Sequence, residues 1–344
     1  MTNNRNIVVI GASAGGLPAL QQLVQELPQD LDAAIFILLH SSPSAPSLLA
    51  PILQRYTKIP VNQAKNGDRI KTGTIVVAKP DYHLILEEHT IRLTRGPREN
   101  RSRPAIDALF RSAAYSHSAR VIGIVLTGAL DDGTAGLWSI RDRGGVAIVQ
   151  DPTDATFPSM PTSALKYAGA DHVVRLDQIG QLLSRLTAET ALSHDKPASR
   201  ELEIEIAIAK EGRGLQAGVM TLGEITPYTC PECAGVLVKL KQGGVPRFRC
   251  HTGHAYSVNT LLAEVTEHVE GALWGAIRSI EESAMLLDQI ASDLRSGTKD
   301  DGDAELFDQK AKDTQRRADL VRTAAMEHQT LSVDNIADVR HTSR

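Results

Sequence analysis

The first half of the chain alternates short apolar runs with segments of helical periodicity. The runs are apolar on consecutive residues, and they occupy positions 7–10, 34–39, 121–126 and 146–149, with a further one at 172–174. Strands that are covered on both faces have this composition, because neither face meets water. Helical patterns separate the runs, at 17–27, 47–55, 105–116 and 134–141. This alternation predicts an α/β fold built on βαβ units, with a doubly wound, mostly parallel, Rossmann-like sheet.

Two parts of the chain depart from this alternation. Short β-like pieces at 74–78, 83–86 and 90–93 are separated by glycine, proline and charged residues, so we interpret 60–95 as a β-hairpin excursion. After residue 186 the pattern fades into small, polar and proline-bearing residues. We predict an α/β domain at 1–188, a linker at 189–225, a cysteine-containing module at 226–258, a helical hairpin at 259–330 and a tail at 331–344.

Composition narrows the class of protein. The 344 residues carry a formal net charge of −4, which argues against a nucleic-acid binder that depends on a basic surface. No apolar stretch approaches the roughly 20 residues that span a bilayer. The first strand follows the N-terminus directly, without the pattern of a signal peptide. We expect a cytoplasmic protein that does not insert into membranes.

The turn after the first apolar run, GASAGG at 11–16, admits three interpretations. A dinucleotide-binding loop, G-x-G-x-x-G, needs a glycine where Ser13 stands, and no acidic residue ends the next strand. As G-x-S-x-G between strand and helix, the turn would lift the Ser13 hydroxyl above the carboxyl edge of the sheet. The third interpretation is a tight connection without chemistry. A nucleophile requires a base and an acid elsewhere in the chain.

Both occur at the ends of other predicted strands. His40 ends the run AIFILL, and Asp131 and Asp132 follow VIGIVLTGAL. Open α/β sheets assemble their sites at the carboxyl ends of strands. Taken singly, such a histidine is more often structural, and an aspartate before a helix more often caps it. The chain order Ser, His, Asp differs from the order Ser, acid, His of α/β-hydrolases.

Five collinear segments together resemble the catalytic domain of the chemotaxis protein-glutamate methylesterase (CheB) family. They are IGASAGG, LLHSSPS, NRSRPAIDALFRSAA, LTGALDDGTAG and SMPTSA, spread over roughly 6–188. The resemblance implies a serine hydrolase that removes methyl esters from glutamate side chains of chemoreceptor-like proteins and that also could deamidate glutamine. Ser13 would be the nucleophile, His40 the general base and acid, and Asp132 the residue that orients His40. Catalysis would need no cofactor, and the partner would be a methylated receptor.

The resemblance also suggests pocket residues. Backbone N–H groups near Ala14 or Ala129 would form the oxyanion hole, and Arg101 and Arg103 match a family segment near the active-site mouth. The chain begins at the catalytic strand, without the receiver domain of well-known members, so we expect no control through phosphorylation of such a domain. The alternative function is a non-catalytic interaction protein that keeps the fold as a docking platform. The intact Ser13, His40 and Asp132 favour the enzyme.

The three cysteines belong to one pattern, Cys230-Pro-Glu-Cys233 followed, after sixteen intervening residues, by Cys250-x-x-x-His254. Two thiolates, a third thiolate and an imidazole at these spacings predict a closed, structural Zn²⁺ site. His251 competes with His254 as the fourth ligand, but its adjacency to Cys250 would strain joint chelation. A buried cluster without metal is the alternative. The module resembles a zinc-ribbon-like extension found on some methylesterase-like proteins.

Two further features of the C-terminal half concern possible binding partners. Lys239, Lys241, Arg247 and Arg249 form a modest basic stripe, for which we consider nucleic-acid binding the weaker interpretation. Helical periodicity at 259–295 and 303–328, across a short loop, predicts an antiparallel hairpin or coiled coil. We expect packing within the chain, with self-association through these helices as the alternative.

Overall fold

The computed structural model describes residues 4–192, 196–240, 246–297 and 301–329, together with Leu331 and Ile336. The chain divides into two compact units, Met1–Leu261 and Leu262–Arg344, and each is described by itself. Within the described residues, no helix has both the length and the apolar character needed to cross a bilayer.

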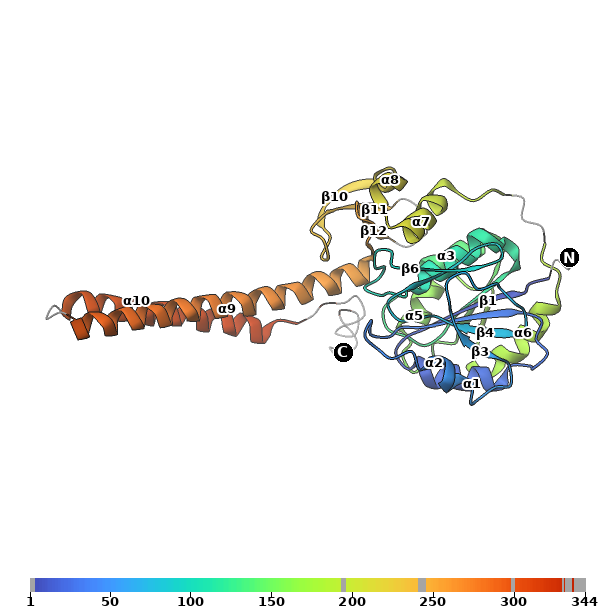
Figure 1. Cartoon of the computed structure of the whole chain (residues 1–344), viewed down its shortest axis with the longest axis horizontal. Helices are drawn as coiled ribbons and strands as arrows, with labels where there is room; N and C mark the ends of the chain where they lie inside the picture. Colours follow the sequence, from blue (N-terminus) through green and yellow to red (C-terminus); the bar gives the residue numbers. More distant parts are fainter. Residues whose placement is uncertain are drawn as a thin grey trace, which may run out of the picture. The chain divides into compact units, whose positions relative to one another are not determined.

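One large sheet organises the first unit, and its strands pair in parallel throughout (Figure 1). From edge to edge the strands are β3 (Val61–Gln63), β4 (Thr74–Val77), β2 (Ala34–Leu39), β1 (Ile7–Ala12), β7 (Val121–Val125), β8 (Val146–Gln150) and β9 (His172–Val174). The chain winds outward from β1 through β2 and later through β7, so the strand order reverses between β1 and β7. The doubly wound α/β fold is confirmed.

Helices cover both faces of this sheet. One face packs against α1 (Gly16–Glu26), α2 (Leu49–Leu53) and α6 (Ile179–Ala188), the other against α3 (Ile106–His117) and α4 (Thr134–Asp142). In β1, Val8 and Ile10 belong to the first core, while Ile7 and Val9 belong to the second. Both faces of the strand are therefore buried, which is why the strand is apolar on consecutive residues.

The 60–95 segment differs from its prediction. The run at 74–78 is β4, which lies inside the main sheet beside β2, and β3 extends the sheet further. Only β5 (His83–Leu86) and β6 (Ile91–Thr94) form an antiparallel hairpin. Strands of three or four residues carry too few side chains to reveal, from their pattern, which neighbour they pair with.

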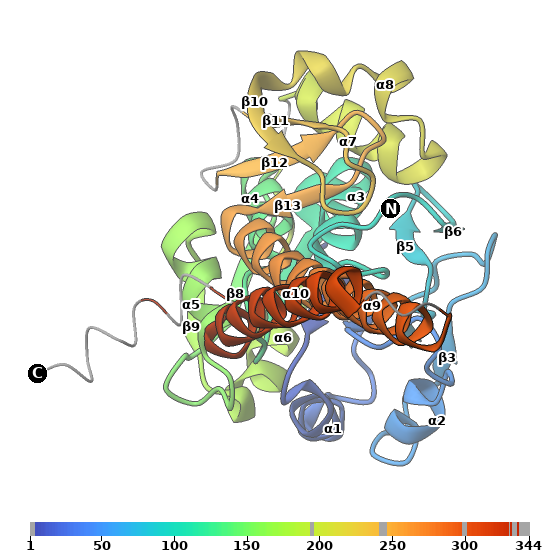
Figure 2. The same cartoon turned by 90° about the vertical axis from the view of Figure 1, so that its left-hand side faces the viewer.

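A small antiparallel sheet follows, made of β10 (Gly223–Thr229), β11 (Val236–Leu240), β12 (Arg247–Cys250) and β13 (Ala255–Ser257) (Figure 2). The stretch 189–225, for which the sequence predicts a linker, contains α7 (Arg200–Glu211) and the short α8 (Gly214–Ala217). The Ser199 hydroxyl caps α7 by accepting the backbone N–H of Leu202 at 3.2 Å. Isoleucines of this helix are buried, so the segment is packed and not a free connection.

The second unit is a helical hairpin, as predicted. It consists of α9 (Val258–Gly297), whose first turn lies in the first unit, and α10 (Asp301–Glu327). The helices are antiparallel, because His328, just after α10, contacts the carbonyl of Thr266 at 2.8 Å near the start of α9. Small residues line the seam, among them Ala284 and Ala291 of α9 and Ala304, Ala311, Ala318 and Ala325 of α10. Apart from Leu331 and Ile336, the predicted tail at 331–344 lies outside the described residues.

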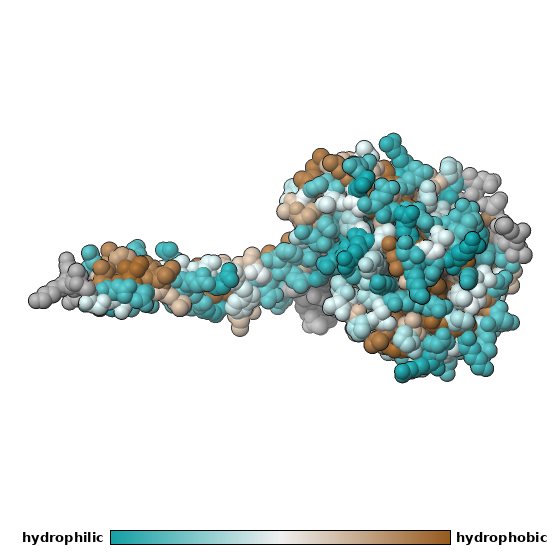
Figure 3. All heavy atoms as spheres, in the orientation of Figure 1, coloured by the Kyte–Doolittle hydropathy of each residue, from teal (hydrophilic) through white to brown (hydrophobic). Residues whose placement is uncertain are grey.

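Apolar side chains also lie on the outside of this hairpin. Met285, Leu286 and Ile290 of α9 are exposed, and Figure 3 shows apolar atoms gathered toward the end at which the helices are joined. Self-association through this face stays a prediction.

Candidate active site

Three of the predicted residues meet at the carboxyl edge of the main sheet. Ser13 follows β1, His40 follows β2, and Asp132 comes after β7, on three strands that are direct neighbours. The strand order reverses between two of them, and such switch points open a crevice above the strand ends. The topology thus brings together residues that lie up to 119 positions apart (132 − 13) in the sequence.

The turn that carries Ser13 is held by hydrogen bonds to the loop that follows β7. The Ser13 N–H donates to the Thr127 carbonyl at 3.0 Å, and the Thr127 hydroxyl donates to the carbonyl of Ala14 at 3.1 Å. Gly15 has a φ of 70°, a left-handed conformation that a glycine adopts without strain. A Cβ at Gly128 would lie 2.9 Å from the Ser13 Cβ, so this glycine lets the two turns approach. Sequence reasoning did not single out Thr127.

The imidazole of His40 bridges the other two residues. Its Nδ1 lies 3.1 Å from Ser13 Oγ, and its Nε2 lies 2.8 Å from Asp132 Oδ2. Serine proteases of the chymotrypsin type use the two nitrogens the other way round. The chemistry is equivalent: with the proton on Nε2 donated to Asp132, the lone pair of Nδ1 faces the Ser13 hydroxyl.

Asp132 is buried and fully hydrogen-bonded. Its Oδ2 accepts from His40 and from the backbone N–H of Ile106 at 2.7 Å, and its Oδ1 accepts from the N–H of Asp107 at 3.1 Å. Because Ile106 begins α3, Asp132 also caps that helix from outside, and the helix dipole favours its negative charge. Burial would raise the pKa of Asp132, but the hydrogen bonds from His40, Asn100 and Ile106 hold that pKa below its usual value.

A second buried carboxyl, Asp107, lies beside Asp132. Burial, followed by the charge of Asp132, raises the pKa of Asp107. The Asn100 side-chain amide separates the two, because its Nδ2 donates to Asp107 Oδ2 and to Asp132 Oδ1, both at 3.0 Å. Sequence reasoning missed Asn100. It is the first residue of the segment NRSRPAID, in which the family resemblance suggested Arg101 and Arg103.

The predicted pocket residues lie in two different settings. Ala14 is part of the Ser13 turn, and Ala129 is an exposed residue between β7 and Asp132. Arg103 serves the structure: it donates to Asp81 Oδ1 at 2.7 Å and to the carbonyl of Gly96 at 2.8 Å. Arg101 is exposed and has a φ of 68°. Arg103 is thus engaged in holding two loops together.

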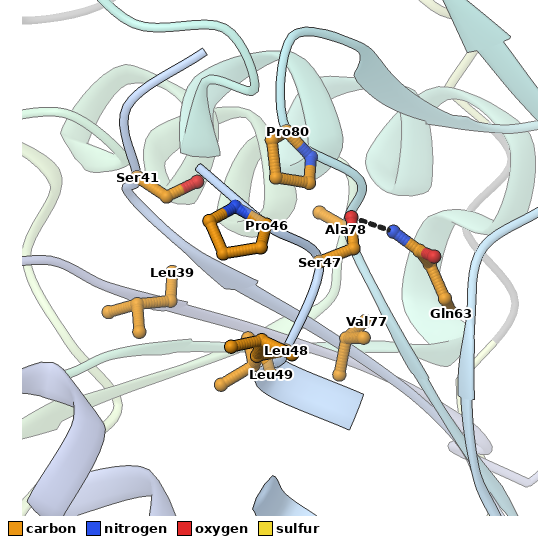
Figure 4. A pocket seen from close by; sticks show the side chains of 10 residues that line it. All are labelled: Leu39, Ser41, Pro46, Ser47, Leu48, Leu49, Gln63, Val77, Ala78 and Pro80. Carbon is orange, nitrogen blue, oxygen red and sulfur yellow. Dashed lines mark hydrogen bonds between the residues drawn. The ribbon is translucent and has the colours of Figure 1, made fainter. Parts of the chain in front are cut away.

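A small pocket lies beside the residues that flank His40. Its volume is about 50 Å³, and Figure 4 shows its lining of Leu39, Ser41, Pro46, Ser47, Leu48, Leu49, Gln63, Val77, Ala78 and Pro80. Most of these side chains are apolar, and a hydrogen bond between Ser47 and Gln63 spans one side.

The cysteine pattern forms a second candidate site, a metal centre in the small sheet. Ligand atoms of Cys230, Cys233, Cys250 and His254 lie within 4.8 Å of one another, which brings together the four predicted ligands. Individual distances are 3.7 Å between Cys233 Sγ and Cys250 Sγ and 3.5 Å between Cys250 Sγ and His254 Nδ1. A tetrahedron with Zn–S of about 2.3 Å and Zn–N of about 2.0 Å has S–S edges of about 3.8 Å and S–N edges of about 3.5 Å. The donor set therefore fits a zinc ion.

The surroundings of the cluster agree with that fit. Glu232 Oε2 lies 3.3 Å from His254 Nε2, so the nitrogen that is turned away from the cysteines has a carboxylate partner. Gly253, with a φ of 113°, makes the tight turn that brings His254 back to Cys250. The described cluster does not include His251.

The basic stripe is not a free cationic surface in the part of the chain that is described. Arg247 donates to Glu205 at 2.8 Å, and Arg249 donates to Glu205 and to Glu99 at 3.1 and 3.0 Å. Both arginines are buried. Lys241 lies outside the described residues.

Comparison with known proteins identifies the first half of the chain. Residues 8–183 match the family model described as CheB methylesterase. The crystal structure of the CheB methylesterase catalytic domain of Thermotoga maritima aligns with a TM-score of 0.51 and 31% identity, covering 53% of this chain and 98% of that one.

Two curated relatives give the same result. A Leptospira interrogans protein, whose name assigns it provisionally as a protein-glutamate methylesterase/protein-glutamine glutaminase, is 38% identical over 184 residues, which are 53% of this chain and 95% of the relative. A protein-glutamate methylesterase/protein-glutamine glutaminase of Methanosarcina acetivorans is 37% identical over 190 residues, and the match covers 53% of each chain.

Proposed function

The chain belongs to the CheB methylesterase family, and on this premise we propose that it hydrolyses glutamyl methyl esters of chemoreceptor-like proteins, with Ser13 as nucleophile. The observation that carries the proposal is the chain of contacts from Ser13 Oγ through both nitrogens of His40 to Asp132, at 3.1 and 2.8 Å. A histidine with a purely structural role needs only one hydrogen-bond partner. A hydrogen-bonded series of hydroxyl, imidazole and buried carboxylate is the arrangement that activates a serine.

The first half-reaction transfers the acyl group to the enzyme. His40 Nδ1 takes the hydroxyl proton as Ser13 Oγ attacks the ester carbonyl, while Asp132 accepts the Nε2–H and stabilises the imidazolium. When the tetrahedral intermediate collapses, the C–O bond to the methoxy group breaks, and His40 returns the proton to release methanol. The glutamyl carbonyl is then esterified to Ser13.

Water completes the reaction. His40 removes a proton from a water molecule that attacks the acyl-enzyme, and the proton passes to Ser13 Oγ as glutamate leaves. Backbone N–H groups of Ala14 and Ala129 are our candidates for the oxyanion hole, which commonly contributes about 3 kcal/mol per donor. A glutamine substrate would pass through the same intermediate and release ammonia, which agrees with the second activity in the names of the relatives.

The test is methanol release from a methyl-esterified receptor. Ser13→Ala should reduce the rate by roughly 10⁴-fold or more, because the remaining groups cannot form the acyl-enzyme. Ser42→Ala is the matched control, since Ser42 is an exposed serine two residues after His40 that bonds to Ser44 at 3.0 Å. A Ser13→Ala protein that releases methanol at the wild-type rate would exclude the mechanism.

We further propose that Cys230, Cys233, Cys250 and His254 hold a structural Zn²⁺. Four protein ligands close the coordination sphere, so the metal would stabilise the small sheet and would not take part in hydrolysis. Thiolate ligands of this kind persist in reducing compartments, which supports a cytoplasmic location.

Metal analysis of purified protein tests the zinc proposal. We expect about one zinc per chain, and loss of that zinc in His254→Ala. His251→Ala removes the neighbouring histidine outside the cluster and should keep the metal. Equal zinc content in the wild type and in His254→Ala would show that the assignment of the fourth ligand is wrong.

A further inference from the structure

The carboxylate that orients His40 is itself held by Asn100, and the support of Asn100 comes from far along the chain. Asn100 and Arg101 both have left-handed backbone conformations, with φ values of 49° and 68°. Outside glycine such conformations are uncommon and need support from their surroundings. The 98–100 segment obtains it from β13: the Asn100 N–H donates to the carbonyl of Ala255 at 2.8 Å, and the Ala255 N–H donates to that of Arg98 at 3.1 Å.

The residues after Ala255 continue this contact. Ser257 and Thr260 form a reciprocal cap at the start of α9: Ser257 Oγ accepts the backbone N–H of Thr260 at 3.0 Å, and Thr260 Oγ1 accepts that of Ser257 at 2.8 Å. Each hydroxyl still has its own hydrogen to donate. Ser257 Oγ donates to Asp131 at 2.7 Å. With the Ser257 hydrogen directed to Asp131, Thr260 Oγ1 has three acceptors within reach: Asn100 Oδ1 at 3.2 Å, Ser257 Oγ at 3.0 Å and the Ser257 carbonyl at 3.3 Å. Of these three, Asn100 Oδ1 is the acceptor that belongs to the site.

These contacts determine which way the Asn100 carboxamide points. Its Oδ1 shares the Ser257 backbone N–H with Thr260 Oγ1, at 3.0 and 2.8 Å, and lies 3.2 Å from the Thr260 hydroxyl. A backbone N–H is always a donor, so the oxygen must face α9 and the nitrogen must face the two carboxyls. The nitrogen then reaches Asp132 Oδ1 at 3.0 Å. All four residues are buried, so water does not compete for these hydrogen bonds.

We infer that Ser257 and Thr260 are positioning residues for the reaction: through Asn100 they fix the carboxylate of Asp132, and through Asp132 the ring of His40. The inference rests on the proposed function of Ser13, His40 and Asp132. The inference gives the first turn of α9 a role in the geometry of the site. This turn lies beyond the part of the chain that matches the family model. Small displacements of a catalytic group lower the rate of the chemical step more than they weaken binding.

A fluorophosphonate probe phosphonylates an activated serine. Its rate of labelling tests the positioning role of Thr260 on the full-length protein, without a receptor. Thr260→Val keeps the shape of the side chain and removes its hydroxyl. We expect the maximal labelling rate to fall roughly tenfold, with the half-saturating probe concentration unchanged. Thr260→Ser restores a hydroxyl and should label within about twofold of the wild type. Asn100→Gly, which tolerates the left-handed backbone, should label at least as slowly as Thr260→Val.

Ser199→Ala is the matched control, because it removes the cap of α7 in the same part of the chain without touching Asn100. A cap of this kind contributes about 1 kcal/mol to stability. We expect Ser199→Ala to label at the wild-type rate. Wild-type labelling of Thr260→Val, or an equal decrease in Ser199→Ala, would overturn the inference. Failure of the wild-type protein to label at Ser13 would instead overturn the proposed function, and the inference with it.

Discussion

At the scale of residues, a buried ionic cluster joins the α/β domain to the small sheet. Its members are Glu99, Arg111, Glu205, Arg247 and Arg249. Arg249 donates to carboxylates of two different segments, Glu99 before α3 and Glu205 in α7. Buried charges are costly unless every partner is present, so the cluster is stable only as a set.

Glu205→Gln should therefore destabilise the protein strongly. The substitution removes the buried counter-charge of Arg247 and leaves Arg249 paired with Glu99. Removal of one partner of a buried pair costs about 3–5 kcal/mol. The measurement is the free energy of unfolding in denaturant. Glu203→Gln, at an exposed position of the same helix, is the control and should lie within about 0.5 kcal/mol of the wild type. A small effect at Glu205 would contradict this assignment of the cluster.

The same residue predicts a dependence of stability on pH. Burial would raise the pKa of Glu205, but the charges of Arg111, Arg247 and Arg249 lower it below its ordinary 4.5. A carboxyl whose pKa is lowered by folding stabilises the native state above the unfolded pKa, and this contribution is lost as the pH falls. The stability difference between wild type and Glu205→Gln should be constant above pH 4.5 and should shrink below it. A difference that is independent of pH would exclude ionised Glu205 as its source.

Sequence reasoning named the three residues that meet at the edge of the sheet but not the residues that support them. Ser13, His40 and the pair Asp131 and Asp132 each follow an apolar run, and strand ends meet at one edge of a parallel sheet. The family resemblance then selected Asp132. Asn100 gives no such signal, because its role depends on a contact with Thr260, 160 positions away. The family resemblance suggested that Arg103 lies near the active-site mouth, and in the structure its guanidinium pairs with Asp81. Pairing of this kind is a tertiary property that local pattern does not contain.

At the scale of elements, the hairpin of α9 and α10 is built around small residues. Ala304, Ala311, Ala318 and Ala325 lie seven residues apart, and all are buried. Side chains at this spacing return to one face of a helix in a coiled coil, and alanine permits close approach of the partner. The apolar periodicity was sufficient to predict the two helices. The residues that they bury against each other are mainly alanines.

Ala318→Leu should weaken this hairpin. The larger side chain has no room in the seam, and overpacking of this kind costs about 1–3 kcal/mol. Ala324→Leu places the same side chain at an exposed position of the same helix and should change stability by less than about 0.5 kcal/mol. Unfolding followed by helical circular dichroism distinguishes the two. Equal effects of both substitutions would contradict the observed seam.

The two kinds of strand in the main sheet show what the apolar pattern of the sequence can and cannot predict. The central strands β1 and β7 are buried on both faces, and their apolar runs identify them. β4 alternates half-buried and buried residues over four positions. Such a short pattern indicates a strand but not its place in the sheet, which is set by pairing with β2.

At the scale of the whole molecule, the family match covers less of the chain than the residues that support the site. The match ends at residue 183, yet Arg249, Ala255, Ser257 and Thr260 contact the loop that holds Asp132 in place. The candidate zinc ligand His254 immediately precedes this contact segment. A metal that orders the small sheet would therefore also order a support of the active site.

The proposed mechanism requires that the receptor glutamyl group esterifies Ser13 during turnover. The most direct measurement is an acid quench of the wild-type enzyme with methylated receptor, followed by mass spectrometry of the covalent receptor–enzyme adduct. We predict an ester between a receptor glutamyl group and Ser13, and no adduct with Ser13→Ala. An adduct at another residue, or loss of receptor methyl groups at the wild-type rate with Ser13→Ala, would exclude Ser13 as the nucleophile.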